Sequence, residues 1–150
     1  MMRRLIAAAI ASPGTGRRAM LAAGIRWAAA IVFLIFGAAK FTDHAAELAS
    51  FRHYPLPVPD VAVYAVAALE ITGGLLLAIG LLTTLAALAL AADMVGAIIV
   101  SGLARREIIS LTLAPALLAA MISLIRSGAG DYSLDRHLAA GMSRPRAAQP

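Results

Sequence analysis

The chain of 150 residues contains no cysteine. This absence excludes a structural disulfide, a Cys-x-x-Cys redox pair, a thiolate zinc site and cysteine ligation of an iron–sulfur cluster. The dinucleotide-binding pattern G-x-G-x-x-G, the Walker A phosphate loop and the G-x-S-x-G nucleophile elbow are also missing from the sequence. No familiar catalytic motif therefore identifies a reaction.

Charged residues are scarce. They make up 14% of the chain, whereas hydrophobic residues make up 61%. Soluble domains are closer to about one quarter charged and about one half apolar, so the excess apolar surface is expected to face lipid. The net charge is +5, but the basic residues lie at the ends of apolar runs and in the two tails. That distribution is typical of membrane topology, and nucleic acid is not expected as a partner.

Four long apolar segments predict an all-α fold, an integral membrane four-helix bundle. Each segment is about 20 residues long, enough to cross about 30 Å of hydrocarbon at about 1.5 Å per residue. Glycine and threonine residues between the second and third segments predict a tight turn and an antiparallel hairpin. The expected helices cover about residues 21–41, 61–82, 84–103 and 108–125.

The segments that flank these helices have distinct compositions. Residues 1–20 predict a basic cytoplasmic arm, with a cleaved signal peptide as the alternative, and residues 139–150 predict a disordered tail. Residues 21–138 form the expected membrane domain. In the loop between the first two helices, residues 44–51 predict a short interfacial helix, with Phe51 and Tyr54 at headgroup depth. Asp60 is the candidate N-cap of the second helix.

The distribution of lysine and arginine predicts the orientation of the bundle. With the N-terminus inside, nine of these residues lie on the inner side and four on the outer side. Cytoplasmic loops are enriched in both residue types, so both termini are expected in the cytoplasm. The chain is thus predicted to be a multi-pass protein of the inner (plasma) membrane, with the lipid bilayer as its first partner.

Two carboxylates, Glu70 and Asp93, lie deep inside apolar segments. Each is nine residues from the start of its segment, about 13 Å into the membrane at about 1.5 Å per residue. A charge at that depth costs about 2.5 kcal/mol or more, so a function or a partner is expected. Small residues at helical spacing around both, typical of close helix contacts, predict that they face the bundle interior: Ala67, Gly73, Gly74, Ala86, Ala89, Gly96 and Ala97.

Two carboxylates close together in a low dielectric do not both ionise easily unless a cation compensates. Lys40 and Arg26 on the first helix are the candidate cations. The predicted spans place Lys40 about 12 Å above Glu70, so direct contact requires extended side chains or a shifted helix. Glu70 and Asp93 therefore predict either a site that handles protons or binds a ligand, or polar groups that hold the helices together.

Histidines and aromatic residues are less informative. His44, His53 and His137 lie outside the apolar runs, which argues against a bis-histidine haem in the bundle, and no spacing matches a metal-ligand motif. No metal site is therefore expected. Trp27 and Tyr132 near helix ends are interpreted as interfacial anchors.

Over roughly residues 22–138 the chain resembles the DoxX-like family of small membrane proteins. Four motifs in order carry the resemblance, the last being Gly128-x-Gly130-x-Tyr132-Ser133-Leu134-Asp135. The first helix contributes Arg26, Phe33, Gly37 and Lys40, and the loop contributes Phe51 and Leu56-Pro57-Val58-Pro59. The second helix contributes Leu69-Glu70-Ile71-Thr72-Gly73-Gly74-Leu75-Leu76-Leu77 with Gly80-Leu81-Leu82-Thr83.

The resemblance implies a four-helix bundle with a link to redox chemistry. Some relatives are described as the quinone-linked membrane subunit of thiosulfate oxidation, and others as oxidoreductases without a defined reaction. The residues carried over are Arg26, Lys40, Glu70, Gly73, Gly74 and Asp135, with the two adjacent glycines as a close-packing face beside the cofactor. Asp93 is not part of that pattern, so its role rests on the physical argument alone.

Two hypotheses follow. In the first, the chain is a membrane oxidoreductase component that binds a quinone, with a soluble redox partner or a membrane complex supplying electrons. Glu70 and Asp93 would exchange protons, and Lys40 or Arg26 would stabilise negative charge. In the second, the chain is a non-catalytic scaffold, an assembly factor, or a small transporter with a proton relay. No cofactor other than a quinone is implied, and whether the chain is an enzyme stays open.

Overall fold

The computed structural model describes residues 16–54, 58–104, 106–130 and 132–142. Those residues form helices, and no strand occurs among them. The predictions for residues 1–15, including the cleaved signal peptide, and for the tail after residue 142 lie outside the described residues.

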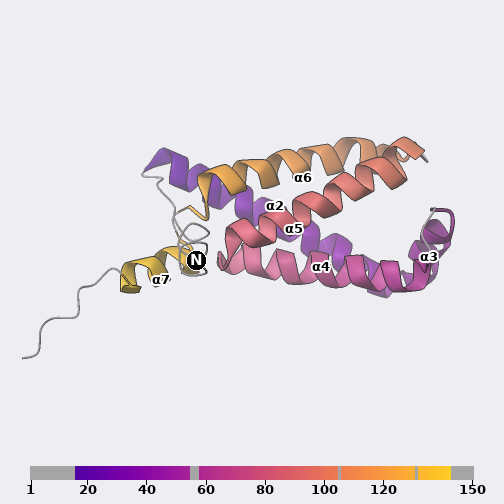
Figure 1. Cartoon of the computed structure of the whole chain (residues 1–150), viewed down its shortest axis with the longest axis horizontal. Helices are drawn as coiled ribbons and strands as arrows, with labels where there is room; N and C mark the ends of the chain where they lie inside the picture. Colours follow the sequence, from indigo (N-terminus) through magenta and orange to yellow (C-terminus); the bar gives the residue numbers. More distant parts are fainter. Residues whose placement is uncertain (1–15, 55–57, 105, 131, 143–150) are drawn as a thin grey trace, which may run out of the picture.

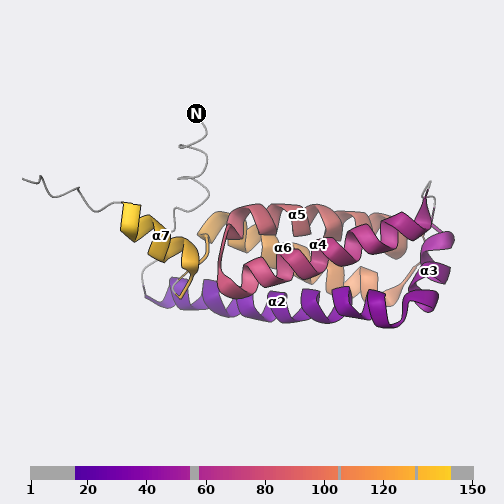
Figure 2. The same ribbon diagram turned by 90° about the horizontal axis from the view of Figure 1, so that it is seen from below.

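Four helices are long and apolar enough to cross a membrane: α2 (Arg17–Thr42), α4 (Pro59–Ile79), α5 (Thr83–Ala97) with its π-helical extension η1 (Ile98–Leu103), and α6 (Ile108–Ser127). They run along the length of the molecule, with the short helix α3 (His44–Arg52) at one end and α7 (Leu134–Met142) at the other (Figure 1). The turned view shows the same arrangement, with α2 along one side of the bundle (Figure 2). The predicted all-α membrane bundle is confirmed. The two ends are called here the α3 end and the α7 end.

Helix boundaries differ from the predicted ones where capping residues decide them. Helix α2 begins at Arg17, so the last four residues of the predicted arm are helical. Helix α4 begins with Pro59, a residue suited to the first helical position, and the N-cap is therefore Val58 instead of the predicted Asp60. Asp60 lies in the first turn, where its negative charge is favourable near the helix N-terminus.

Two short helices flank the bundle. The interfacial helix expected near residues 44–51 is present as α3, and the His44 ring stacks on Tyr64 of α4 with a centroid distance of 4.5 Å. Helix α7 was not predicted, and it extends four residues into the segment for which a disordered tail is predicted, from 139 to 142. Its Leu134 and Asp135 follow Gly128 and Gly130, which both have positive φ and turn the chain after α6.

Close helix contacts rest on small residues, as expected for a membrane bundle. A Cβ atom added to Gly37 of α2 would lie 2.8 Å from Ile71 Cγ1 and 3.1 Å from the Ile71 backbone nitrogen of α4. The outer faces carry large apolar side chains, such as Ile31, Leu85 and Ile108, which are 59%, 52% and 76% exposed. This surface suits a lipid environment.

Candidate functional site

A cavity of about 510 Å³ lies between the helices, within the range of about 300–1,000 Å³ typical of small-molecule sites. Its walls come from all four long helices. The lining residues lie within 32–40 of α2, 62–70 of α4, 93–101 of α5 and η1, and 107–117 at the start of α6, together with Glu47, Phe51 and Tyr54. Most of these side chains are apolar, so a few polar groups define the chemistry of the cavity.

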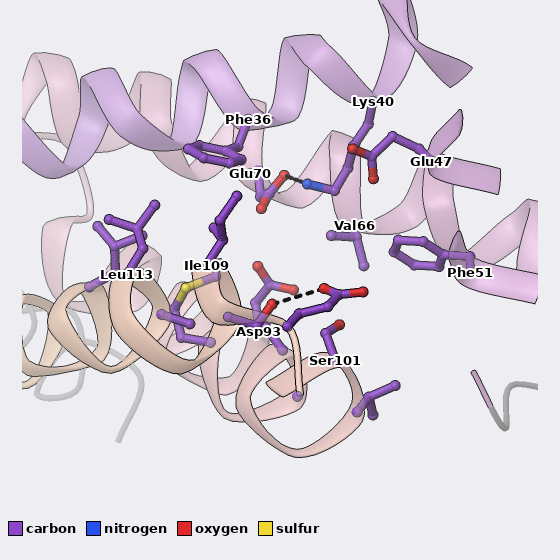
Figure 3. A pocket seen from close by; sticks show the side chains of 18 of the residues that line it. Phe36, Lys40, Glu47, Phe51, Val66, Glu70, Asp93, Ser101, Ile109 and Leu113 are labelled. Atoms are coloured by element: carbon purple, nitrogen blue, oxygen red, sulfur yellow. Dashed lines mark hydrogen bonds and ion pairs between the residues drawn. The ribbon is translucent and has the colours of Figure 1, made fainter. Parts of the chain in front are cut away.

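Lys40 and Glu70 form an ion pair inside the cavity. The distance from Lys40 Nζ to Glu70 Oε2 is 2.6 Å, and the two side chains are only 10% and 6% exposed. Figure 3 shows the pair with Glu47 pointing into the same space from α3. Helical side chains lean toward the N-terminus of their own helix. Because α2 and α4 are antiparallel, Lys40 and Glu70 lean toward each other, which closes the separation of about 12 Å expected from the sequence.

Asp93 lines the cavity from α5, across from the ion pair (Figure 3). Its Oδ2 atom is buried and has no hydrogen-bond partner among the residues that the structure describes. The structure thus brings Glu70, Asp93 and Lys40 together at one cavity.

Arg26 lies elsewhere. Its side chain is fully buried, and its guanidinium donates hydrogen bonds to the carbonyl oxygens of Leu77, Ala78 and Tyr132, at 2.9 Å for Ala78 and 3.0 Å for Tyr132. The first two are at the C-terminus of α4, where helix carbonyls lack intrahelical partners. The expectation that Arg26 compensates Glu70 or Asp93 is therefore wrong, because its guanidinium contacts backbone carbonyls at the α7 end and does not line the cavity that contains both carboxylates.

Asp135 lies at the same end as Arg26. Its carboxylate accepts hydrogen bonds from the backbone N–H groups of Leu82 at 2.7 Å and Thr83 at 2.9 Å, and so caps the N-terminus of α5. Its own backbone N–H donates to the Gly80 carbonyl at 2.9 Å. Arg26, Gly80, Leu82, Thr83 and Asp135 are called the clasp, because they join α2, the α4–α5 turn and α7.

Gly73 and Gly74 lie in helix contacts, away from the cavity wall. A Cβ atom on Gly73 would lie 2.9 Å from the Leu90 side chain of α5. A Cβ atom on Gly74 would lie 3.1 Å from the Leu34 side chain and 3.3 Å from the Ala30 carbonyl oxygen of α2. The two glycines therefore let α4 pack closely against α2 and α5, and they do not line the cavity.

Sequence reasoning missed a polar group at the α3 end of the cavity. The Tyr54 hydroxyl donates a hydrogen bond to Glu107 Oε1 at 2.8 Å, and Ser110 Oγ donates to Glu107 Oε2 at 3.3 Å. Tyr54 is only 9% exposed, so its side chain packs within the protein, and its depth in the membrane stays a prediction. Burial raises the pKa of the Tyr54 hydroxyl, which keeps its proton. No spacing signal in the sequence links Glu107, which lies just before the fourth apolar segment, to Tyr54.

Histidines do not contribute to the cavity wall. His53 Nδ1 contacts the Ala49 carbonyl within α3, and His137 Nδ1 contacts the Ser133 carbonyl near α7. Within the described ranges, no group of three His, Asp or Glu side chains is arranged to hold a metal ion. The polar groups that line the cavity are one ammonium, four carboxyl groups, one phenol and two serine hydroxyls.

This arrangement can bind an apolar molecule that carries hydrogen-bonding oxygens at one end. Its apolar walls remove the body of a ligand from water, and the Lys40 ammonium donates hydrogen bonds to an oxygen. Asp93 and Glu70 add carboxyl groups to the same wall. The described residues of the cavity thus combine an apolar chamber with an ammonium and carboxyl groups.

Comparison with protein families gives one match. The DoxX family model matches residues 21–103, more than half of the chain. The matched range includes Arg26, Lys40, Glu70 and Asp93 and ends at the last residue of η1. No curated protein and no solved structure matches the chain.

Proposed function

This chain belongs to the DoxX family of membrane proteins, and we propose that it binds a quinone in the cavity between its helices as a component of a membrane oxidoreductase. The observation that supports the proposal most directly is the composition of the cavity. An apolar chamber of about 510 Å³ contains the buried Lys40–Glu70 pair, and Asp93 adds a second carboxyl group to its lining.

The shape and lining of the cavity fit a quinone. Phe33, Phe36 and Phe51 line it, and aromatic side chains pack well against a flat ring. The lining of α6 extends from Glu107 to Leu117, about 15 Å at about 1.5 Å per residue. That length accommodates a ring together with the first part of an isoprenoid chain, whose remainder would pass between the helices into lipid.

A bound quinone supplies the redox chemistry, since its reduction to the quinol takes two electrons from a partner redox protein and two protons. Lys40 binds and orients a carbonyl oxygen through its ammonium and balances negative charge in a low-dielectric site. Asp93, through its unpartnered Oδ2, holds a proton within reach of the cavity. Glu70 keeps Lys40 charged and in place, and it exchanges a proton when that pair rearranges.

The proposal is tested on protein purified in mild detergent, with quinone quantified by mass spectrometry of the extracted lipids. The wild type is expected to retain quinone, and Lys40→Met/Glu70→Gln is expected to lose at least about tenfold, a difference of about 1.4 kcal/mol. The matched control is Arg52→Met/Asp60→Asn, which removes an exposed pair at 4.0 Å outside the cavity and should retain wild-type quinone.

The same preparation separates the two hypotheses for this chain. Wild-type protein that carries no quinone, or equal retention by the cavity variant, would contradict quinone binding. If in that case Glu70→Gln changes complex assembly or solute movement in vesicles, the scaffold or transport hypothesis takes its place.

A further inference from the structure

The cavity occupies only one half of the bundle. On α2 its lining begins at Val32 and continues to Lys40 near the C-terminus, and on α4 it stops at Glu70. On α5 it begins at Asp93, and on α6 it stops at Leu117. Because these helices alternate in direction, all four contribute only their halves nearest the α3 end (Figure 1).

In the half nearest the α7 end, buried apolar side chains such as Leu77, Met121 and Leu124 fill the space between the helices. A separate hollow of about 580 Å³ lies there between Arg18 and Ala19 of α2 and residues 119–127 of α6, and it shares no lining residue with the cavity.

The α7 end is closed by the clasp. Arg26 and Thr83 are fully buried and Asp135 is 1% exposed. Gly130 packs against α2 so closely that an added Cβ would lie 2.6 Å from the Ala19 carbonyl oxygen. A buried guanidinium also opposes the entry of protons and other cations, as positive groups do in selective pores. The clasp and the buried apolar side chains therefore separate the cavity from the aqueous phase at this end.

The α3 end is built differently. Tyr54 follows α3 and reaches across to Glu107 at the start of α6, a bond between residues 53 positions apart in the chain. On the α5–η1 helix, Asp93, Ala97 and Ser101 are spaced by four residues and all line the cavity. Residues at this spacing share one helix face, so they form a continuous wall from mid-cavity to the α3 end. The Ser101 carbonyl accepts a hydrogen bond from the Glu107 backbone N–H at 3.3 Å.

We propose that the cavity exchanges water and protons with one aqueous phase only, the phase at the α3 end, and that the hydrogen-bonded Tyr54–Glu107 pair is the gate and proton-transfer group of that path. The inference rests on the cavity and the clasp and holds whatever molecule occupies the cavity. If a quinone is bound, this path supplies its protons. With both termini inside, as the charge distribution predicts, the α3 end faces the outside of the cell.

Each proton that enters the Tyr54–Glu107 pair is matched by one proton that leaves it. The Glu107 carboxylate takes a proton from hydronium in the aqueous phase at the α3 end. The Tyr54 hydroxyl, which donates to Glu107 at rest, turns inward and gives its proton to a cavity carboxylate, Glu47 or Asp93, while the Tyr54 oxygen takes the proton from Glu107, so the Tyr54–Glu107 hydrogen bond is restored after each transfer. The charged groups that face this pair are Glu47 from α3 and Lys40 from α2, and Glu70 and Asp93 lie further along the cavity. Ser110 of α6 keeps the Glu107 carboxylate oriented.

The lack of native cysteine makes a direct accessibility test simple. In Ala97→Cys, the single thiol lies in the cavity wall, and a charged, membrane-impermeant thiol reagent is added to one side of oriented vesicles. Labelling from the α3 side is expected to be at least tenfold faster than from the α7 side. Ala46→Cys on α3 and Leu138→Cys on α7, both exposed, report which side the reagent reaches.

The gate is tested by removing the Tyr54 hydroxyl. Tyr54→Phe in the Ala97→Cys background is expected to speed labelling from the α3 side at least fivefold. Tyr64→Phe is the matched control, because Tyr64 is an exposed tyrosine at the same end and does not line the cavity. Glu107→Gln is expected to slow deuterium uptake by the cavity carboxyl groups, measured by infrared spectroscopy, at least fivefold, with Asp60→Asn as the control.

Equal labelling of Ala97→Cys from both sides, labelling only from the α7 side, or no labelling even with Tyr54→Phe would each overturn the proposal. So would unchanged labelling in Tyr54→Phe together with unchanged deuterium uptake in Glu107→Gln. One-sided, Tyr54-dependent labelling of a protein that retains no quinone would leave this inference standing and contradict only the proposed function.

Discussion

At the scale of single residues, the Lys40–Glu70 pair is the feature with the largest energetic consequence. Both charges are removed from water in the lower-dielectric interior, and each is tolerated because the other compensates it at 2.6 Å. Removal of one partner leaves an uncompensated buried charge, whereas removal of both leaves two neutral side chains of similar size. The stability losses of the two single variants should therefore not add up in the double variant.

We predict that Lys40→Met and Glu70→Gln each lower the free energy of unfolding by about 3–5 kcal/mol, and that the double variant loses less than either single variant. Reversible unfolding in mixed micelles measures all three. The exposed Arg52–Asp60 pair is the control, and its removal should change stability by no more than about 1 kcal/mol. Strictly additive losses in the double variant would contradict a coupled pair.

The buried Tyr54 hydroxyl predicts that the stability of the fold decreases at high pH. Burial raises its pKa above the ordinary value of 10.0, so above that pH the folded state binds more protons than the unfolded state. Stability contributed by the protonated phenol is thus complete below pH 10 and is lost as the pH rises through the folded pKa. We predict that wild-type stability falls more steeply above pH 10 than that of Tyr54→Phe, as measured by unfolding between pH 8 and 12 (roughly the range of tyrosine titration). Parallel profiles would contradict this assignment.

At the scale of helices, the clasp explains how the α4–α5 hairpin and α7 are joined. Helix ends leave backbone N–H and carbonyl groups without intrahelical partners. Arg26 satisfies carbonyls at the end of α4, and Asp135 satisfies N–H groups at the start of α5. The clasp thus adds partners from α2 and α7 to the backbone cap that Gly80 provides at the end of α4, and it supplies the side-chain cap that Leu82 does not provide at the start of α5.

We predict that Asp135→Ala lowers the free energy of unfolding by about 1–2 kcal/mol, the usual cost of a lost N-cap. Amide hydrogen exchange at Leu82 and Thr83 should rise in the same variant, because their N–H groups lose their acceptors. Asp60→Ala is the control, since Asp60 lies in the first turn of α4 without a side-chain cap bond. If the amides of Leu82 and Thr83 exchange as slowly in Asp135→Ala as in the wild type, the clasp is not formed as described.

Two glycines predict opposite effects of the same substitution. Gly80 has φ +68°, and an added Cβ would lie 2.6 Å from Ser133 Cβ, so Gly80→Ala should destabilise by about 1–3 kcal/mol. Gly96 has open space around its Cβ position, so Gly96→Ala should be neutral or stabilise by up to about 1 kcal/mol. Unfolding measurements on both variants check the pair, and similar losses at the two positions would contradict the account.

At the scale of the whole molecule, hydropathy fixes the fold well because lipid imposes a length and a composition on each span. The four spans, the hairpin turn and α3 were predictable, and Glu70 and Asp93 were found because an ionisable residue in an apolar run stands out. Tertiary contacts were not predictable in this way. The sequence did not show that Arg26 contacts backbone carbonyls instead of the carboxylates, or that Tyr54 contacts Glu107. Spacing along one helix does not reveal which distant backbone or side-chain group a residue contacts.

The difference between the two ends of the bundle is its main feature at this scale. The cavity lies toward α3 and the clasp toward α7, so the two aqueous phases meet different surfaces of one small protein. The inside position of the termini stays a prediction from nine basic residues against four. Lys40, Glu70 and Asp93 line a single chamber, and we propose that a quinone occupies it.

The most direct test of that claim is a binding titration of a short-chain quinone into detergent-solubilised protein, with Ala97→Phe and Ala92→Phe compared. Ala97 lines the cavity, whereas Ala92 is exposed on the outer face of the same helix. The account predicts that Ala97→Phe raises the quinone Kd at least about tenfold, about 1.4 kcal/mol, and that Ala92→Phe leaves it unchanged. Equal Kd values for Ala97→Phe and the wild type, or no saturable binding to the wild type, would contradict it.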